Sequence, residues 1–221
     1  MIKVIETADG SYSLFSEELQ ETYHSINGAE QESLHVYIDN GLAKLSQSTE
    51  QIKILEIGFG AGLNALLSYE FILKQSPLSS LFYHAIEPYP LEEQVLSEYI
   101  KSFSDSRNSV IKEIHQSAWN EAVVLSDQFS IYKDMSQLQQ FVPQGQYDLV
   151  FFDAFGPEAQ PEMWEIEMLA KSVGSLKKNG LWLSYCAKGQ VRRDLQSLGL
   201  AMERLEGPPG KREMLKGTRL A

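Results

Sequence analysis

The chain of 221 residues lacks the sequence features of exported, membrane-spanning and metal-dependent proteins. Its one cysteine, Cys186, has no partner for an intrachain disulfide, which fits a reducing compartment. There is no charged and apolar leader after Met1 and no apolar run of about 18 residues, so we expect neither export nor membrane insertion. The four histidines show no paired ligand spacing, so we expect no metal site. These absences predict a cytoplasmic protein with one buried core.

Charge is distributed unevenly along the chain. Residues 171–221 contain 11 Lys and Arg against 4 Asp and Glu, whereas residues 1–170 contain 8 basic and 26 acidic side chains. Such an asymmetry predicts that the basic C-terminal part faces nucleic acid while the acidic remainder repels it. The alternative is that these basic residues are only the solvated ends of helices and strands.

One strand-to-helix turn carries the clearest chemical pattern. Residues 54–64 join an apolar strand, the acid Glu56 and three alternating glycines, Gly58, Gly60 and Gly62. The spacing differs from the dinucleotide fingerprint, and no Gly-Lys-Ser/Thr follows to hold a triphosphate. An E-x-G-x-G-x-G loop is typical of sites for S-adenosylmethionine, a nucleoside without phosphate. The alternative is that the glycines serve only the tight turn and the packing of the helix.

Two further acids follow expected strands. Residues 81–87 read as a strand that ends in Glu87, where a carboxylate can accept hydrogen bonds from ribose hydroxyls; otherwise Glu87 is a surface acid. Residues 129–134 end in Asp134, which is placed to take the adenine amino group, to cap the helix expected after it, or both.

A continuous apolar strand over residues 147–153 delivers Asp153 to the edge of the expected sheet. An acceptor amine must present its lone pair in line with the methyl group, so a carboxylate beside it can take a proton or steer it. Phe155 offers a stacking face for a base extracted from its strand. The alternative for Asp153 is a loop carboxylate that caps the helix expected near Pro161.

The order of elements predicts an α/β fold. We expect a hairpin over residues 3–15, a helix over 32–45, and then strands at 53–57, 81–87, 129–132, 147–153 and 181–186 that alternate with helices at 63–74, 91–103, after 132, 161–176 and 190–198. This alternation predicts a doubly wound parallel sheet. Residues 200–205 and 213–219 have no helix between them and should pair antiparallel. A parallel sheet that ends in such a hairpin is the seven-stranded architecture of Rossmann-like methyltransferases, here with residues 1–50 as an N-terminal β-hairpin and helix extension packed on a domain of residues 51–221.

The ordered set of motifs resembles the bacterial tRNA wobble-uridine methyltransferase domain, found as the N-terminal half of bifunctional MnmC and as stand-alone MnmD. The matching segments are 32–36, 56–64, 153–157 followed by 161–164, 191–193 and 210–214. Only the second is common by itself, whereas the ordered set is specific. Gly156 is a modest departure from the usual motif.

The resemblance implies methylation, with S-adenosylmethionine as donor, of the 5-aminomethyl group of a (2-thio)uridine in the tRNA anticodon, giving 5-methylaminomethyl-2-thiouridine. By motif match Asp153 would be the catalytic carboxylate. The cofactor site would contain Glu56, Gly58, Gly60, Gly62, Asn64, Glu87 and Asp134. No second glycine-rich nucleotide motif is present, so we expect no fused flavin domain, and another enzyme must supply the aminomethyl nucleoside.

The basic residues expected to meet RNA phosphates are Lys188, Arg192, Arg193, Lys211 and Arg212. Two other functions stay open at this point. One is transfer to a small-molecule amine on the same fold, including polyamine aminopropyl transfer, for which no acid-rich polycation site is obvious in the sequence. The other is a non-catalytic cofactor-binding or RNA-binding module, against which the intact Asp153 counts.

Overall fold

The computed structural model describes residues 1–46, 49–76 and 78–220. Over these residues an eight-stranded sheet runs through the molecule in the order β10-β11-β9-β8-β4-β5-β7-β6. The five strands from β9 to β7 are parallel, and antiparallel strands lie at both edges. The strands are β4 (Gln51–Ile57), β5 (Ser80–Ile86), β6 (Ala122–Ser126), β7 (Phe129–Asp134), β8 (Tyr147–Phe152), β9 (Leu176–Ser184), β10 (Leu200–Glu206) and β11 (Glu213–Arg219).

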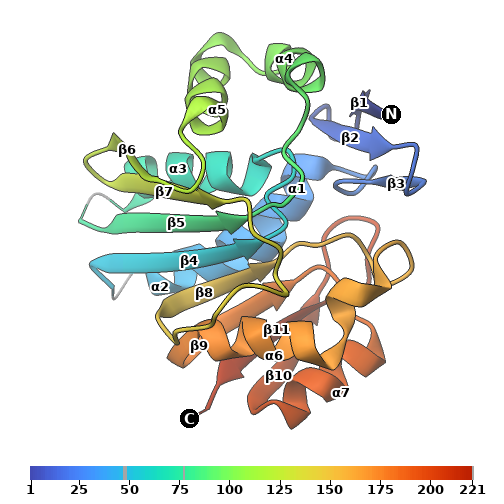
Figure 1. Ribbon diagram of the computed structural model, residues 1–221, viewed down its shortest axis with the longest axis vertical. Coiled ribbons are helices and arrows are strands. Elements are labelled where there is room, and N and C mark those ends of the chain that lie inside the picture. The colour runs from blue at the N-terminus through green and yellow to red at the C-terminus, as the bar shows by residue number, and fades with distance from the viewer. Residues whose placement is uncertain (47–48, 77, 221) are drawn as a thin grey trace.

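Helices cover both faces of this sheet, as Figure 1 shows. One face carries α1 (Ala29–Ser33), the π-helix η1 (Leu34–Leu42), α2 (Ala43–Leu45), α3 (Leu63–Gln75) and α5 (Asp105–Gln116), with α4 (Glu93–Lys101) beside them. The other face carries the 3-10 helix η2 (Pro161–Trp164), α6 (Ile166–Ser175) and α7 (Gly189–Ser197). Side chains of β4 alternate between the two cores, with Ile54 in one and Leu55 in the other. Both faces are therefore apolar, as a parallel sheet requires.

A second, three-stranded sheet lies beyond the carboxyl ends of the parallel strands (Figure 1). It consists of β1 (Ile2–Glu6), β2 (Tyr12–Ser16) and β3 (Glu21–Thr22). The expected hairpin is confirmed, and Asp9 stabilises its turn by accepting a hydrogen bond from the Ser11 N–H at 3.0 Å. The small sheet consequently stands where ligands bind in open α/β folds.

The predicted fold class is confirmed, including the antiparallel β10–β11 pair, but three details differ. The sheet has eight strands because β6, in a stretch without a clear pattern, pairs antiparallel with β7. The short helix expected after β7 is wrong: residues 135–146 form turns, and Asp134 accepts a hydrogen bond from the nearby Ser136 N–H instead of capping a helix. The helix expected at 161–176 is interrupted at Glu165, whose ψ of 152° is extended.

The division into an extension of residues 1–50 and a domain of residues 51–221 stays a prediction. In the structure η1 packs on β8 and β9, and its Tyr37 is 1% exposed within the main core. The close packing depends on Gly41, since a Cβ there would lie 2.5 Å from Leu183. Within the described ranges no helix is long and apolar enough to cross a membrane.

Candidate active site

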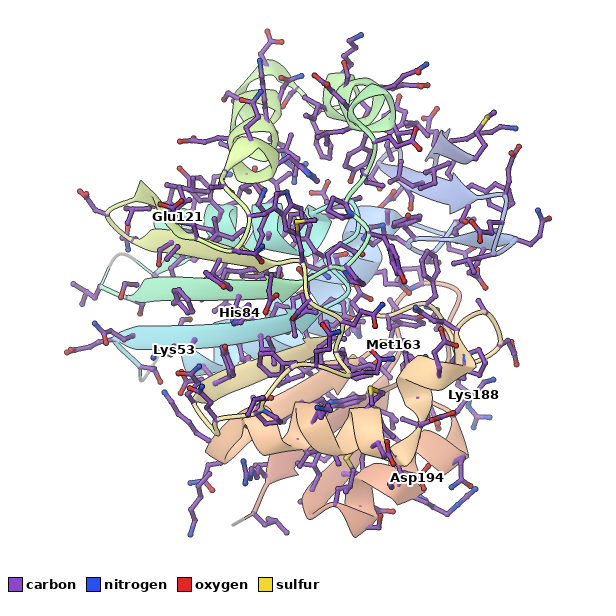
Figure 2. All side chains as sticks on the ribbon, in the orientation of Figure 1. Lys53, His84, Glu121, Met163, Lys188 and Asp194 are labelled. Atoms are coloured by element: carbon purple, nitrogen blue, oxygen red, sulfur yellow. The ribbon has the colours of Figure 1, made fainter. Side chains whose placement is uncertain are left out.

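A cavity of about 640 Å³ opens at the carboxyl ends of the parallel strands. Its walls come from the glycine loop after β4, the segment after β5, the exit of β8 and the small N-terminal sheet. Figure 2 shows Met163, a wall residue, at this end of the sheet and Lys53 at the opposite end. Of the predicted site residues, the wall contains Gly58, Gly60, Glu87, Asp153 and Phe155.

The glycine loop brings backbone close to the cavity. Gly58 has φ of 92°, and a Cβ there would lie 2.6 Å from the Asp153 carbonyl oxygen. The Gly60 N–H donates to Glu87 Oε2 at 3.0 Å, and the Tyr89 N–H donates to Oε1 at 3.0 Å. These two bonds fix the Glu87 carboxylate in the wall and leave lone pairs on both oxygens for a ligand. Burial raises the pKa of Glu87, while the two N–H groups lower it.

Four of the seven predicted cofactor residues lie outside the wall: Glu56, Gly62, Asn64 and Asp134. Gly62 starts α3 with φ of 73°, and its close neighbours are Phe59 and His115, so it shapes the turn rather than the cavity. The Asp134 carboxylate lies 3.5 Å from the His84 Nε2 atom, and residues 137–139, shortly after it in the chain, belong to the cavity wall. Its contact with adenine stays a prediction.

Asp153 sits in the wall directly after β8, held by two side chains from other elements. The Tyr37 hydroxyl donates to Oδ1 at 2.7 Å, and Asn64 Nδ2 donates to Oδ2 at 2.7 Å. Asn64 Nδ2 also donates to Glu56 Oε1 at 2.9 Å. One amide nitrogen therefore bridges two carboxyl groups, and the position of Asp153 depends on η1 and α3 as well as on β8.

The ionisation of these two acids follows from their surroundings. Burial raises the pKa of Asp153 from 3.8 to about 7; the bonds from Tyr37 and Asn64 lower it, and the charges of Glu32 and Lys211 act in opposite directions. Burial, with the charge of Asp153, also holds the pKa of Glu56 well above its usual range.

The expectation that Glu56 contacts the cofactor stays a prediction. Its side chain is fully buried beneath Asn64, and neither residue belongs to the cavity wall. Both support Asp153 from below, because the strand alternation that buries Ile54 turns Glu56 toward the same core.

Two aromatic rings line the cavity near Asp153, and a third ring and an ion pair lie outside the wall, connected to it through Ala154. Phe155 and Tyr23 lie in the wall with ring centroids 4.9 Å apart and planes at 77°. The Tyr185 hydroxyl donates to the Ala154 carbonyl oxygen at 2.9 Å. Lys211 Nζ lies 3.8 Å from the Tyr185 ring centroid and forms an ion pair with Glu32. The stacking role of Phe155 stays a prediction that its place in the wall suits.

Comparison with known proteins identifies the family. The model of the S-adenosyl-L-methionine-dependent methyltransferase family matches residues 93–220, more than half of the chain. The chain belongs to this methyltransferase family. The cavity fits the family's cofactor, since Gly58 and Gly60 line it with backbone free of side chains and Glu87 offers a fixed carboxylate.

Curated relatives of the methyltransferase carry the name tRNA 5-methylaminomethyl-2-thiouridine biosynthesis bifunctional protein MnmC. That of Vibrio campbellii is 28% identical over 224 residues, covering 92% of this chain and 33% of the relative. That of Idiomarina loihiensis is 29% identical over 217 residues, covering 90% and 36%. The chain thus spans about a third of the length of these relatives. The structure of MnmC2 from Aquifex aeolicus has a TM-score of 0.82 at 24% identity, covering 98% of this chain and 70% of that one, which confirms the fold.

The basic residues of the methyltransferase do not form one free group. Lys188 forms an ion pair with Glu158 at 2.7 Å, and Arg193 donates to Gln190 Oε1 at 2.7 Å. Lys211 is paired with Glu32, while Arg212 is exposed in the same loop. Arg192 is partly buried on α7. Their role as RNA contacts stays a prediction, and the structure brings one of them, Lys211, next to Tyr185 and the exit of β8.

Several site residues carry no recognisable pattern in the sequence. Tyr37 directly follows the motif at 32–36, but its reach to Asp153 depends on the π-helical turn of η1, a geometry frequent at functional sites and invisible to periodicity. His24 and Tyr23 enter the wall from the small sheet. The wall also holds three carboxylates that the sequence did not single out, Glu18, Glu92 and Glu162, beside the predicted Glu87 and Asp153. An acid-rich cavity is therefore present, contrary to the impression given by the sequence.

Proposed function

We propose that this methyltransferase moves the methyl group of S-adenosylmethionine to the 5-aminomethyl amine of the wobble (2-thio)uridine of tRNA, giving 5-methylaminomethyl-2-thiouridine. The observation that carries the proposal is the Asp153 carboxylate, fixed in the cavity wall by Tyr37 and Asn64 with its pKa raised to about 7. The names of the MnmC relatives support the choice of substrate.

The cofactor end of the cavity positions the donor. S-adenosylmethionine, when bound, supplies an electrophilic methyl group on its sulfonium sulfur. Glu87 would accept hydrogen bonds from the ribose hydroxyls, and the open backbone at Gly58 and Gly60 would let the nucleoside approach closely. These groups orient the donor and take no part in proton transfer.

Asp153 prepares the acceptor. A primary amine near neutral pH is largely an ammonium ion without a free lone pair. Asp153 takes one proton from that nitrogen and exposes the lone pair for attack, which is the task of a general base whose pKa lies near the working pH. After transfer the secondary amine keeps its remaining charge as an ammonium ion, and Asp153 returns its proton to solvent as the product leaves.

The acids of the wall favour a second candidate, transfer to a small-molecule amine. Glu18, Glu92 and Glu162 are exposed side chains of the wall, and a polycationic amine would be attracted to them. The same carboxylates would repel an RNA backbone, so a tRNA must bring in the base while its phosphates contact another surface.

Labelled S-adenosylmethionine, incubated with the protein and with either bulk tRNA from a strain lacking the modification or a polyamine mixture, decides between the two candidates. We expect label in 5-methylaminomethyl-2-thiouridine after digestion of the tRNA to nucleosides. Label in polyamines with none in tRNA would replace the proposal by the second candidate.

A further inference from the structure

The loop between β10 and β11 is seated firmly beside the active site. Hydrogen bonds from the Gly207 N–H to the Arg212 carbonyl at 3.1 Å and from the Lys211 N–H to the Pro208 carbonyl at 2.9 Å close it. His35 Nε2 lies 2.8 Å from the Glu206 carbonyl oxygen and ties the start of the loop to η1. The position of Lys211 is therefore set by the fold.

Lys211 and Glu32 form an unequally exposed pair. The Glu32 side chain is 5% exposed and also accepts a hydrogen bond from the Ser25 N–H at 2.9 Å, whereas the Lys211 side chain is 31% exposed. Of the three N–H donors of the ammonium, one serves Glu32, and no further hydrogen-bond partner is present among the described residues. The buried carboxylate thus holds a cation whose other donors are open to a ligand.

Stability alone does not account for this pair. Removing a carboxylate and an ammonium from water is costly, and an apolar pair of similar size holds a loop equally well in many proteins. The pair instead stands beside the reaction centre: Tyr185, beneath the ammonium, is anchored to Ala154, and the charges of both partners act on the pKa of Asp153.

The proposed acceptor presents a matching edge. In a 5-aminomethyluridine the carbon next to C5 carries the C4 carbonyl, so an amine directed at Asp153 places a hydrogen-bond acceptor one ring atom away. A cytosine carries an amino group at C4 instead. Because the amino group and the Lys211 ammonium are both donors, they cannot form a hydrogen bond with each other.

We propose that Lys211, held in place by Glu32, donates a hydrogen bond to the C4 carbonyl of the acceptor base and selects uracil over cytosine. This inference rests on the proposed function. It separates two neighbours that the sequence groups together, because Lys211 then contacts the base while the exposed Arg212 is left to contact phosphate.

The test uses two anticodon stem-loop RNAs that carry either 5-aminomethyluridine or 5-aminomethylcytidine at the wobble position. Single-turnover kcat/KM is measured for wild type, Lys211→Met, the double variant Lys211→Met with Glu32→Gln, and the control Arg212→Ala. The double variant leaves no buried carboxylate unpaired. Calorimetric affinity for S-adenosylmethionine verifies that each variant is folded.

We expect wild type to favour uridine by about 10- to 100-fold, the range of a hydrogen bond to a charged group. Both Lys211 variants should lose most of that ratio, whereas Arg212→Ala should keep it. An unchanged ratio in the Lys211 variants, or equal wild-type activity on both RNAs, would overturn the inference and leave the proposed function intact. A wild type inactive on both RNAs would overturn the proposed function as well.

Discussion

The two ends of the cavity are built in opposite ways. The cofactor end comes mainly from two loops close in sequence, residues 57–61 and 86–90, and offers backbone groups and a fixed carboxylate, Glu87. The acceptor end gathers side chains from α1, η1, α3, β8 and the β10–β11 loop around Asp153. A nucleoside cofactor needs close backbone approach, whereas proton transfer needs charges arranged around one atom. We therefore expect substrate choice to be made at the acceptor end.

The largest effect is expected from a substitution of Asp153, which changes only the acceptor end of the cavity. Asp153→Asn keeps the shape and removes the proton acceptor, so single-turnover methyl transfer should fall by about 10²-fold or more. Affinity for S-adenosylmethionine should hardly change. Asp127→Asn is the control, because Asp127 is exposed in the turn between β6 and β7, at the opposite end of the sheet from the cavity. Equal losses in both variants would show that the loss does not come from the place of Asp153 in the cavity.

A substitution at Gly58 should weaken cofactor binding. Gly58→Ala places a Cβ 2.6 Å from the Asp153 carbonyl oxygen at φ of 92°, so we expect affinity for S-adenosylmethionine to fall at least about tenfold, with about 1 kcal/mol of stability lost. Gly199→Ala has nearly the same φ, 93°, with nothing within 4 Å of its Cβ. Calorimetry and denaturant unfolding on both variants separate strain from loss of close backbone approach. Similar affinities for S-adenosylmethionine in the two variants would show that close backbone approach at Gly58 does not contribute to cofactor binding.

Tyr37→Phe should change the pH dependence of methyl transfer. The hydroxyl donates to Asp153 and lowers its pKa, so its removal raises that pKa by about one unit and moves the acidic limb of the pH–rate profile upward. The rate should fall several-fold near pH 7 and recover at higher pH. Tyr99→Phe is the control, because it removes a buried hydroxyl that has no hydrogen-bond partner among the residues that the structure describes. A loss of rate that is the same at every pH would show that Tyr37 acts only through packing.

Arg212→Ala should produce the smallest change. If Arg212 contacts a phosphate, its loss flattens the dependence of log affinity for tRNA on log salt by about one unit or slightly less. Arg204→Ala, at a residue paired with Glu213 on β11, should leave the slope unchanged. Filter binding over a salt series measures both. Coincident slopes for wild type and Arg212→Ala would place the RNA elsewhere.

The sequence predicts well those features of the structure that are determined by residues close together in the chain. The glycine loop, Glu87 and the β10–β11 pair were predicted because each follows from a local pattern of apolar runs, glycines and turn residues. Asp153 was predicted because it ends a continuous apolar strand and matches a family motif. The contact of Glu56 with the cofactor stays a prediction, because the same pattern does not say which face of the strand meets the ligand.

The partners of Asp153 were beyond prediction for a physical reason. Tyr37 reaches it through a π-helical turn, and Lys211 meets Glu32 across 179 positions of chain. Only packing of the whole sheet brings these side chains together. The basic C-terminal charge was counted as one RNA surface, but ion pairs with Glu32 and Glu158 divide it.

Titration of the Asp153 carboxyl carbon shows directly whether this group can act as a general base near neutral pH. In protein labelled with ¹³C at aspartate side-chain carboxyls, the resonance that disappears in Asp153→Asn belongs to this group. We predict that it titrates at about 7, raised by burial against the bonds from Tyr37 and Asn64. Titration near the ordinary value of 3.8 would contradict the account, because such a carboxylate is a poor proton acceptor for an amine near neutral pH.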